Sequence, residues 1–196
     1  MSKIRSTPIK ITAVLGLLLA IAASSLAKTQ PAFPNIKIKN FGQMDERFYR
    51  GGQPKEEDLK DLAALSIKTV INLRDDFEPW EQQAVEATGM RYVSIPMDGH
   101  AYPTTETVNA FLKVVNDPAT GKFFAHCAGG KHRTGSMGAV YRFTHDHWNY
   151  DQVYAEMKQY GFYTYLGHGK FKDFVQDYWN QTQTESATRA AAQGSK

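Results

Sequence analysis

Cysteine is nearly absent from this chain, whose 196 residues contain one, Cys127. A single cysteine excludes an internal disulfide, and with it the class of small exported domains that disulfides hold together. The thiol is therefore either an inert buried side chain or a reactive nucleophile. The residues around it have to decide between these two roles.

The chain also lacks an apolar run long enough for an ordinary membrane span, because the stretch Ile11–Ala23 is too short. Three basic residues precede this stretch, and Ser25 and Ala27 place small side chains where a signal peptidase reads the sequence. Residues 1–27 are thus predicted to be a secretory signal peptide, which places the protein in the periplasm or outside the cell. An uncleaved membrane anchor, with the protein facing outside, is the alternative.

Without these 27 residues the chain has no excess of either charge. The full chain has 23 Lys and Arg against 20 Asp and Glu, but three of the basic residues lie in the predicted signal peptide. The remaining 20 basic and 20 acidic residues do not indicate a broad nucleic-acid-binding surface. Any basic patch in this protein must therefore be local.

What the chain does contain is an alternation of strand and helix patterns. Apolar or β-branched runs predict strands over residues 36–41, 47–52, 68–73, 91–97 and 122–127. Helical spacing and caps predict helices over residues 55–66, 78–89, 104–117, 135–148, 150–163 and 168–180. This alternation favours an α/β fold with a mainly parallel sheet. Residues 28–40 are expected to be a linker and first strand, and the small polar tail 181–196 is expected to be disordered.

The segment His126–Gly135, HCAGGKHRTG, follows the last predicted strand and leads into a helix. Ligands of parallel sheets bind at such strand ends, and the helix N-terminus directs free backbone N–H groups into the same space. Gly129 and Gly130 permit a tight curve, and Arg133 can fork two N–H bonds onto a tetrahedral oxyanion. The same positive field lowers the pKa of the Cys127 thiol. An anion cradle and an activated nucleophile are therefore predicted to share one loop.

Two other interpretations of this segment are weaker. A nucleotide-binding loop needs Ser or Thr after its lysine, but His132 follows Lys131, and the earlier glycine of that motif is absent. A zinc site needs converging ligands, but His145 and His147 are two residues apart on a predicted helix and face different ways. We therefore expect no metal and no cofactor.

The pattern His126-Cys127-x5-Arg133-Thr134-Gly135 resembles the phosphate loop of protein tyrosine and dual-specificity phosphatases. Its variant GKHRTG is similar to the loop of the atypical plant and fungal dual-specificity phosphatases and their exported bacterial relatives. The segments YRGGQP and KTVINLR resemble upstream motifs of that group, in the same order. The predicted signal peptide is a departure, since the plant and fungal members are intracellular.

This resemblance covers most of the chain, from about Phe41 to Tyr165. It implies a tyrosine-phosphatase-type α/β fold, with a four- or five-stranded, mostly parallel sheet flanked by helices. Residues 41–180 are then a phosphatase domain.

The resemblance also implies a role for each residue of the loop. Cys127 attacks phosphorus and forms a phosphocysteine, while Arg133 and the loop backbone hold the phosphate oxygens. The substrate-binding residues are Ala128, Gly129, Gly130, Lys131 and His132. His126 orients the loop and favours the thiolate. Thr134 hydrogen-bonds the sulfur and helps it leave, and it can also cap the following helix.

A loop aspartate upstream of the cysteine is the proton donor in this family, and Asp98 occupies a matching place. It is expected to act first as an acid and then as a base toward water. A solvated turn aspartate is the alternative, because Asp-Gly is a common turn sequence. His100 is the second candidate for the acid. Asp75 and Asp76 follow another strand at the same sheet edge and are expected to be solvated charges or a helix cap.

Lys131 places a cation inside the loop, which is rare in enzymes that act on phosphotyrosine but occurs in phosphoinositide and inositol-phosphate phosphatases. With His132 and Arg133 it favours a substrate that carries several phosphates. A lysine directed to water is the alternative. Arg50 and Arg74 are expected to be structural or rim residues.

The sequence therefore predicts an enzyme that hydrolyses phosphate monoesters through a phosphocysteine, of the dual-specificity or tyrosine-phosphatase type. The expected partner is a phosphorylated substrate, either a phosphoprotein or, as the alternative, an inositol phosphate or lipid phosphate. A phosphate-binding module without catalysis would have a defective loop, and a Cys-x5-Arg redox or arsenate enzyme usually needs further cysteines. No nucleic-acid partner is expected, and the membrane is contacted only if the signal stays uncleaved.

Overall fold

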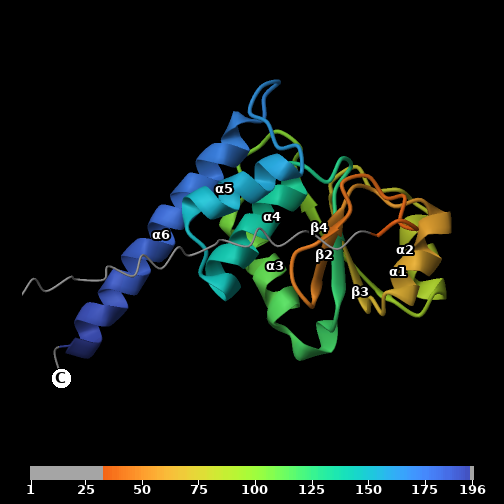
Figure 1. Ribbon diagram of the computed structural model, residues 1–196, viewed down its shortest axis with the longest axis horizontal. Helices are drawn as coiled ribbons and strands as arrows, with labels where there is room; N and C mark the ends of the chain where they lie inside the picture. The colour runs from red at the N-terminus through yellow and green to blue at the C-terminus, as the bar shows by residue number, and fades with distance from the viewer. Residues whose placement is uncertain (1–32, 195–196) are drawn as a thin grey trace, which may run out of the picture.

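The computed structural model of the protein describes residues 33–194 (Figure 1). The predicted signal peptide and the first residues of the predicted linker lie outside the described residues and stay predictions. Within residues 33–194, none of the helices combines the length and the apolar character that crossing a membrane requires.

The order of strands and helices follows the alternation expected from the sequence. The strands are β1 (Gly42–Gln43), β2 (Phe48–Gly51), β3 (Thr69–Arg74), β4 (Arg91–Met97) and β5 (Phe123–His126). The α-helices are α1 (Leu59–Ala64), α2 (Glu81–Ala87), α3 (Thr105–Asn116), α4 (Arg133–Tyr141), α5 (Tyr150–Gln159) and α6 (Gly169–Gly194). The short helices are η1 (Glu56–Asp58), η2 (Pro118–Thr120) and the π-helical turn η3 (Arg142–Asp146).

The strands form one five-stranded sheet in the order β1-β2-β5-β3-β4. β2, β5, β3 and β4 run parallel, and β1 pairs with β2 in the antiparallel sense. The expected α/β fold with a mostly parallel sheet is confirmed. β5 lies in the middle of the sheet, between β2 and β3, so the segment that follows it emerges among the ends of its neighbours.

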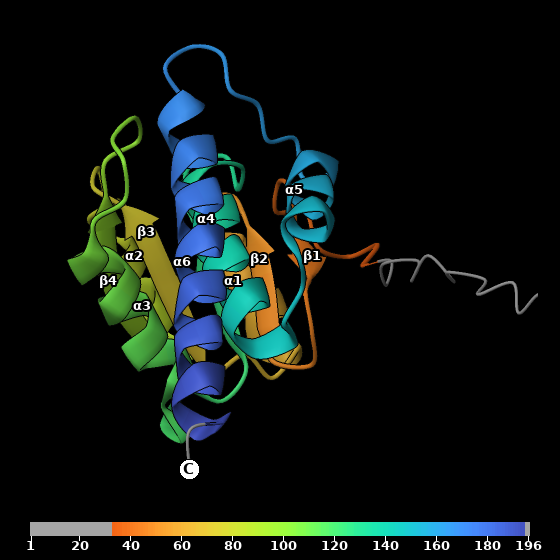
Figure 2. The ribbon, with the colours of Figure 1, turned by 90° about the vertical axis from the view of Figure 1, so that its left-hand side faces the viewer.

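Helices cover both faces of the sheet (Figure 1, Figure 2). α1 and α2 pack on one face, in a core that includes Leu59, Leu62, Val70, Val85 and Phe124. α3, α4, α5 and α6 cover the other face, in a core that includes Ile71, Phe111, Phe123, Met137 and Phe171. Neighbouring residues of one strand enter different cores because side chains alternate along a strand. Burial on both faces explains why β3 and β5 have nearly unbroken apolar sequences.

α3 shows how local sequence and packing agree. The Oγ1 atom of Thr104 accepts a hydrogen bond from the Thr107 amide at 3.2 Å, which caps the helix as expected. Val108, Phe111 and Val115 are buried at helical spacing and face the sheet. The start of α3, and with it the far end of the preceding loop, is thereby fixed.

The strand predicted over residues 36–41 is wrong. Asn40 has a positive φ of 53°, and its side chain donates a hydrogen bond to the carbonyl of Gly129 at 2.8 Å. The carbonyl of Lys39 accepts from the amide of Gly52 at 2.7 Å. These turns bind the segment to distant loops, and such contacts override the alternating pattern that favoured a strand. The first strand begins at Gly42 instead.

The disordered tail predicted from Gln181 also differs from the structure, in which α6 continues to Gly194. Side-chain hydrogen bonds run along this part of the helix, from Gln181 to Glu185 at 2.9 Å and from Ser186 to the carbonyl of Thr182 at 2.8 Å. The alanine-rich end has a high helix propensity. Polar composition alone did not indicate this, because exposed helices can be polar on all sides.

Candidate active site

The phosphate loop (residues 127–133) joins β5 to α4. The surrounding chain binds its carbonyls: that of Ala128 accepts from the amide of Gln53 at 3.2 Å, and that of Gly129 accepts from Asn40. The amide of Gly130 also lowers the pKa of the Cys127 thiol. The loop is therefore held from outside through its carbonyls.

Gly130 is the residue at which the loop comes closest to its neighbours. Its φ is +66°, and a Cβ atom at this position would lie 2.5 Å from the carbonyl carbon of Gly51 and 2.6 Å from the nitrogen of Gly52. Both the backbone conformation and the space require glycine. Gly129 differs, because the nearest atom to an added Cβ would be a Lys131 carbon at 3.9 Å.

We expect Gly130→Ala to lower the free energy of unfolding by about 2–4 kcal/mol, from backbone strain together with overpacking. Gly129→Ala is the matched control, and its cost should stay below about 1 kcal/mol. Urea unfolding of both variants measures the difference. Equal costs for the two substitutions would show that the contact with Gly51 and Gly52 does not constrain the loop.

Cys127 is 4% exposed at the base of the loop. Burial raises the pKa of its thiol, but the hydroxyl and amide of Thr134, the charge of Arg133 and the amide of Gly130 outweigh this effect. The pKa therefore lies below its ordinary value, which favours the thiolate, the form that acts as a nucleophile. Thr134 thus favours the thiolate, and its predicted help to the leaving sulfur stays a prediction.

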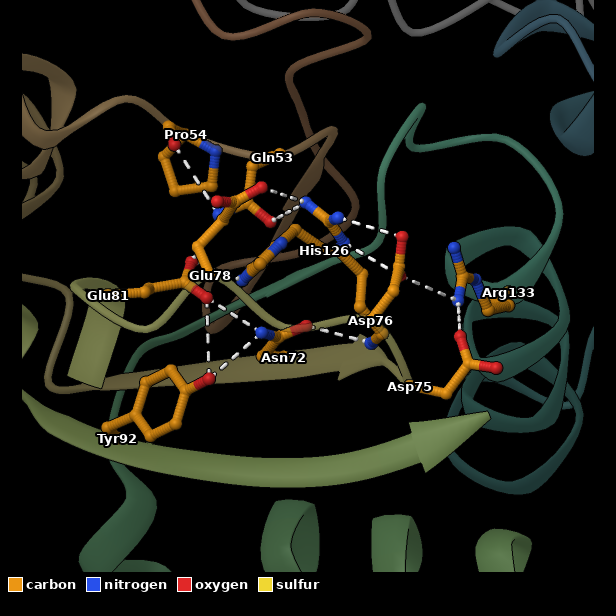
Figure 3. Close-up of polar contacts among 11 residues, drawn as sticks. Gln53, Pro54, Asn72, Asp75, Asp76, Glu78, Glu81, Tyr92, His126 and Arg133 are labelled. Atoms are coloured by element: carbon orange, nitrogen blue, oxygen red, sulfur yellow. Dashed lines mark hydrogen bonds and ion pairs between the residues drawn. The ribbon is translucent and has the colours of Figure 1, made fainter. Parts of the chain in front are cut away.

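Arg133 is held at the mouth of the loop (Figure 3). Its Nη1 atom donates to Oδ1 of Asp75 at 2.7 Å and to the carbonyl of Met97 at 3.0 Å. The expectation that Asp75 is only a solvated charge or a helix cap is wrong, because β3 lies beside β5 and carries Asp75 to the guanidinium. Asp76 is also near, at 3.7 Å. Both short contacts use Nη1, and Nε with Nη2 form the edge that can bind two oxygens of an anion.

Glu81, the first residue of α2, is fully buried behind the loop (Figure 3). Its Oε1 atom lies 3.0 Å from Nε2 of His126 and accepts from Gln53 at 2.6 Å. Its Oε2 atom accepts from Asn72 at 2.7 Å and from Tyr92 at 3.3 Å. Burial raises the pKa of Glu81, but these partners, His126 first, outweigh it and hold the pKa below its ordinary value. The buried carboxylate is therefore charged and fully surrounded by donors.

This network shows how His126 is oriented immediately before the nucleophile. The sequence analysis assigned an orienting role to His126 but did not find Glu81, which resembles any acidic residue in the first turn of a helix. One signal was available, since Asn72 is a polar residue inside the otherwise apolar strand β3. A buried polar side chain requires partners, and these partners lie in other elements.

The roles of Arg50 and Arg74, left open by the sequence, are structural. Arg50 is 1% exposed, donates a hydrogen bond to the carbonyl of Gly130 and lies 3.9 Å from the centroid of the Tyr160 ring. Burial lowers its pKa from the ordinary value. Arg74 donates to the Oε1 atom of Gln53 at 2.9 Å, which connects it to the network around Glu81. Both arginines therefore stabilise segments that surround the phosphate loop.

Asp98 follows Met97, whose carbonyl binds Arg133, so the structure brings it to the edge of the phosphate loop. Its Oδ1 atom accepts from the amide of His100 at 2.7 Å and from that of Ala101 at 2.9 Å. These bonds hold the pKa of the exposed carboxyl below its ordinary value. The turn interpretation of Asp98 is thus confirmed, and its role as proton donor stays a prediction. Both amide bonds end on Oδ1, so Oδ2 can carry a proton while the turn is kept.

The structure does not place His132 as the sequence predicted. Its ring is 8% exposed, Nε2 lies 3.0 Å from the carbonyl of Tyr163, and the ring stacks on His168 with centroids 3.7 Å apart. Burial, and after it the neighbouring His168, lower the pKa of His132 to about 4. The prediction of a cationic His132 side chain is wrong, because the ring packs into the protein and its pKa is lowered. The place of His132 among the substrate-binding residues stays a prediction.

The burial of the His132 ring should make the free energy of unfolding depend on pH. The unfolded chain protonates His132 near its ordinary pKa of 6.5, whereas the folded protein does so only near about 4. Protons therefore favour the unfolded state in this range, and stability falls as the pH is lowered. Between about pH 7 and about pH 4.5, wild type should lose about 2 kcal/mol relative to His132→Phe, as measured by urea unfolding. A parallel loss in both proteins would contradict the assignment.

Lys131 is half-buried at the edge of the loop. Its Nζ atom lies 5.1 Å from the centroid of the Tyr163 ring, a cation–π distance. The side chain therefore packs along the protein surface, and its ammonium group stays beside the loop.

The phosphate loop brings together a thiol that favours the thiolate, backbone amides and the Arg133 guanidinium, with the Asp98 carboxyl at its edge. Such a set can bind a tetrahedral anion and attack its central atom. Within the part of the chain that the structure describes, no three His, Cys, Asp or Glu side chains are grouped to hold a metal ion.

Residues 31–175 match the family described as a DSP-PTPase phosphatase fused to NAD+ kinase. The chain belongs to this family of DSP-PTPase phosphatases. It is 29% identical over 147 residues to the dual specificity protein phosphatase TpbA of Pseudomonas aeruginosa, a match that spans 72% of this chain and 64% of TpbA. It is 31% identical over 103 residues to the inositol diphosphatase DSP3 of Arabidopsis thaliana, across 50% of this chain and 51% of that protein. The chain thus spans less than two thirds of the length of these two relatives.

The same relationship is visible in three dimensions. The crystal structure of P. aeruginosa TpbA superposes with a TM-score of 0.62 at 23% identity, covering 76% of this chain and 88% of that one. At this level of identity the similarity shows the fold, and the expected tyrosine-phosphatase-type architecture is confirmed.

Proposed function

We propose that the protein is a cysteine-dependent phosphatase that hydrolyses phosphate monoesters, of the dual-specificity or tyrosine-phosphatase type. One observation carries this proposal: Cys127 is biased toward the thiolate at the base of a loop closed by Arg133. Nucleophile and anion site thus coincide, which phosphoryl transfer requires. Family membership supports the same reaction.

The reaction proceeds in two steps. In the first, the Cys127 thiolate attacks phosphorus, a sulfur–phosphorus bond forms, and the ester bond to the leaving oxygen breaks. That oxygen takes the proton of Asp98. In the second, Asp98 takes a proton from water, the resulting hydroxide attacks phosphorus, and the sulfur–phosphorus bond breaks. Phosphate leaves and the thiolate is restored, with Arg133 and the loop amides holding the equatorial oxygens in both steps.

Two measurements test this proposal together. The purified protein is assayed for phosphate release from an aryl phosphate in the presence of a metal chelator. A rapidly quenched reaction is then digested, and mass spectrometry is used to search for a phosphorylated peptide that contains Cys127. Phosphate release without any phosphocysteine, or release that requires an added divalent cation, would contradict the proposal.

A second candidate, hydrolysis of inositol phosphates or lipid phosphates, is favoured by the position of Lys131. Its ammonium group lies at the edge of the loop, over the Tyr163 ring, where a second phosphate of the substrate can reach it. Several relatives of this chain are named inositol diphosphatases, including DSP3 of Arabidopsis thaliana and SIW14 of Saccharomyces cerevisiae. Others, such as TpbA, are named protein phosphatases, so substrate preference has to be measured.

Lys131→Ala should distinguish these two substrate classes. For a multiply phosphorylated substrate, we expect a fall in kcat/KM that corresponds to a loss of about 1–3 kcal/mol of transition-state stabilisation. This is the range of a charge-assisted hydrogen bond. For a phosphotyrosine peptide we expect little change, because one phosphate fills the cradle. The loss should shrink as salt is added.

Lys158→Ala is the matched control, since its Nζ atom also lies 5.1 Å from a tyrosine ring, that of Tyr154. Assays with both substrates at low and moderate ionic strength decide the outcome. Equal losses on the two substrates, or none on either, would leave Lys131 without a role in selection and favour the phosphoprotein substrate.

We also propose that the protein acts outside the cytoplasm. The support is the basic and apolar pattern of residues 1–27. Cell fractionation followed by N-terminal sequencing tests this proposal. A protein that stays in the cytoplasm with an intact N-terminus would contradict it, whereas a membrane-bound full-length chain would favour the uncleaved anchor.

A further inference from the structure

Three histidine rings stack beside the phosphate loop. The ring centroids of His132 and His168 are 3.7 Å apart with an interplanar angle of 7°. Those of His168 and His100 are 4.8 Å apart with an angle of 18°. His168 is therefore the central ring of a continuous histidine stack, formed by His100, His168 and His132.

The three rings come from segments that are far apart in the sequence. His132 belongs to the phosphate loop and directly precedes Arg133. His100 belongs to the Asp98 loop (residues 98–104), which joins β4 to α3. His168 ends the α5–α6 loop (residues 160–168). The stack thus connects the segment that binds phosphate to the segment that carries the proton donor.

One end of the stack is fixed in the interior. The buried His132 ring lies 3.0 Å, at Nε2, from the carbonyl of Tyr163, and it packs against Phe162 and Phe171 with centroids 5.2 Å and 5.9 Å away. The other end, His100, is exposed. Because His132 is buried, its ring fixes the ring of His168 by stacking. His168 in turn fixes the loop that carries His100.

The Asp98 loop is met at a second point by the α5–α6 loop, because a Cβ atom added at Gly167, next to His168, would lie 3.2 Å from a carbon of the His100 ring. The far end of this loop is held elsewhere, where the hydroxyl of Tyr102 donates to Asp177 at 3.1 Å. The near end, which carries Asp98, is held by the stacking of His168 on His100 and by the Met97 carbonyl bound to Arg133. The contacts of His168 are thus concentrated at the catalytic end of the loop.

Neutral imidazoles are suited to this position. Burial, and after it the nearby His100, lower the pKa of His168, and Arg133 acts in the same direction. Neutral rings can stack at van der Waals distance, whereas charged rings of His132 and His168 beside Arg133 would repel one another. His132 and His168 therefore stack without adding charge to the site.

We propose that His168 is a positioning residue for the proton donor. By stacking between His132 and His100, it holds the Asp98 loop against the phosphate loop in the geometry that proton transfer requires. This inference rests on the proposed phosphatase function. A catalytic group displaced by about 1 Å can lose about 10²-fold in rate, so loosening this loop should act on the proton-dependent step and not on phosphate binding.

The test compares kcat and KM for phenyl phosphate, a poor leaving group, and p-nitrophenyl phosphate, a good one. His168→Ala is expected to lower kcat about tenfold on phenyl phosphate and less than about twofold on p-nitrophenyl phosphate, with KM unchanged. His168→Phe keeps a flat ring in the stack and should recover most of the loss. His145→Ala is the matched control, because His145 stacks on Tyr141 at 4.1 Å, at the other end of α4.

A double variant with Asp98→Asn shows whether His168 acts through Asp98. If it does, His168→Ala adds less than about twofold to the loss that Asp98→Asn causes on phenyl phosphate. Fully additive losses, equal losses of His168→Ala on both substrates, or no loss at all would overturn the inference.

Hydrogen exchange tests the same contact without catalysis. Amides of residues 97–102, including those of His100 and Ala101, should exchange faster in His168→Ala than in wild type, and His168→Phe should restore protection. If wild type failed to hydrolyse aryl phosphates, the proposed function would fall, and the exchange measurement would still decide whether His168 holds the loop. Unchanged exchange in His168→Ala would overturn the inference.

Discussion

Cys127→Ser should reduce the hydrolysis of every phosphate monoester to background while the affinity for inorganic phosphate is retained. A serine hydroxyl has a pKa far above neutral and has no base beside it, so the same Thr134, Arg133 and Gly130 contacts that stabilise a thiolate cannot produce an alkoxide. Phosphate binding survives because the cradle consists of backbone amides and Arg133. Steady-state kinetics and calorimetric titration with phosphate measure the two properties separately.

Thermal unfolding provides the control for this variant, since a serine in the place of Cys127 nearly preserves the volume of a buried side chain. A large drop in Tm would mean that lost activity reflects lost structure. Substantial hydrolysis by a well-folded Cys127→Ser protein would exclude the thiol as the nucleophile.

Asp98→Asn should lower kcat by about 10²–10⁴ on phenyl phosphate, because the leaving oxygen then departs without a proton. The loss should be much smaller on p-nitrophenyl phosphate, whose leaving group is stable as an anion. The amides of His100 and Ala101 hold the pKa of Asp98 below its ordinary value, so the acid form is favoured only at low pH. Activity of wild type on phenyl phosphate should therefore fall as the pH rises. This decrease with pH should be absent in Asp98→Asn.

His100→Phe is the comparison for Asp98→Asn, because it removes the second candidate for the acid and keeps a flat ring in the histidine stack. If Asp98 is the donor, His100→Phe should leave the ratio of kcat on phenyl phosphate to kcat on p-nitrophenyl phosphate close to that of wild type. A small and equal effect of Asp98→Asn on both substrates would show that Asp98 is not the proton donor. His100, or no side chain, would then be the donor.

The order of strands and helices was predictable because each is encoded by a local pattern. Apolar runs at β3 and β5 and the Thr104 cap at α3 are short-range signals that burial then reinforced. The two errors, at residues 36–41 and at the tail from Gln181, concern segments with weak apolar patterns. In the first, hydrogen bonds from Asn40 to Gly129 replaced a strand; in the second, side-chain bonds such as Gln181 to Glu185 extended a helix.

The sequence signal for the phosphate loop is equally short-range. Cys127 and Arg133 are six residues apart, and the glycines between them and the helix that follows determine where both side chains point. The supporting residues are different, because Glu81 reaches His126 from the start of α2, and Asp75 reaches Arg133 from the end of β3. No spacing in the sequence connects them, and each alone looks like an ordinary surface acid.

The sequence by itself determined the family and predicted the nucleophile and the anion-binding loop, because these depend on residues adjacent along one strand, turn and helix. Only the tertiary structure decided which side chains surround that loop. It buried His132 and made it neutral where the sequence suggested a cation, and it stacked His168 between two loops that the chain places far apart. The physical reason is that burial and ring contact depend on how the α5–α6 loop packs over the carboxyl edge of the sheet, which no local pattern of residues specifies.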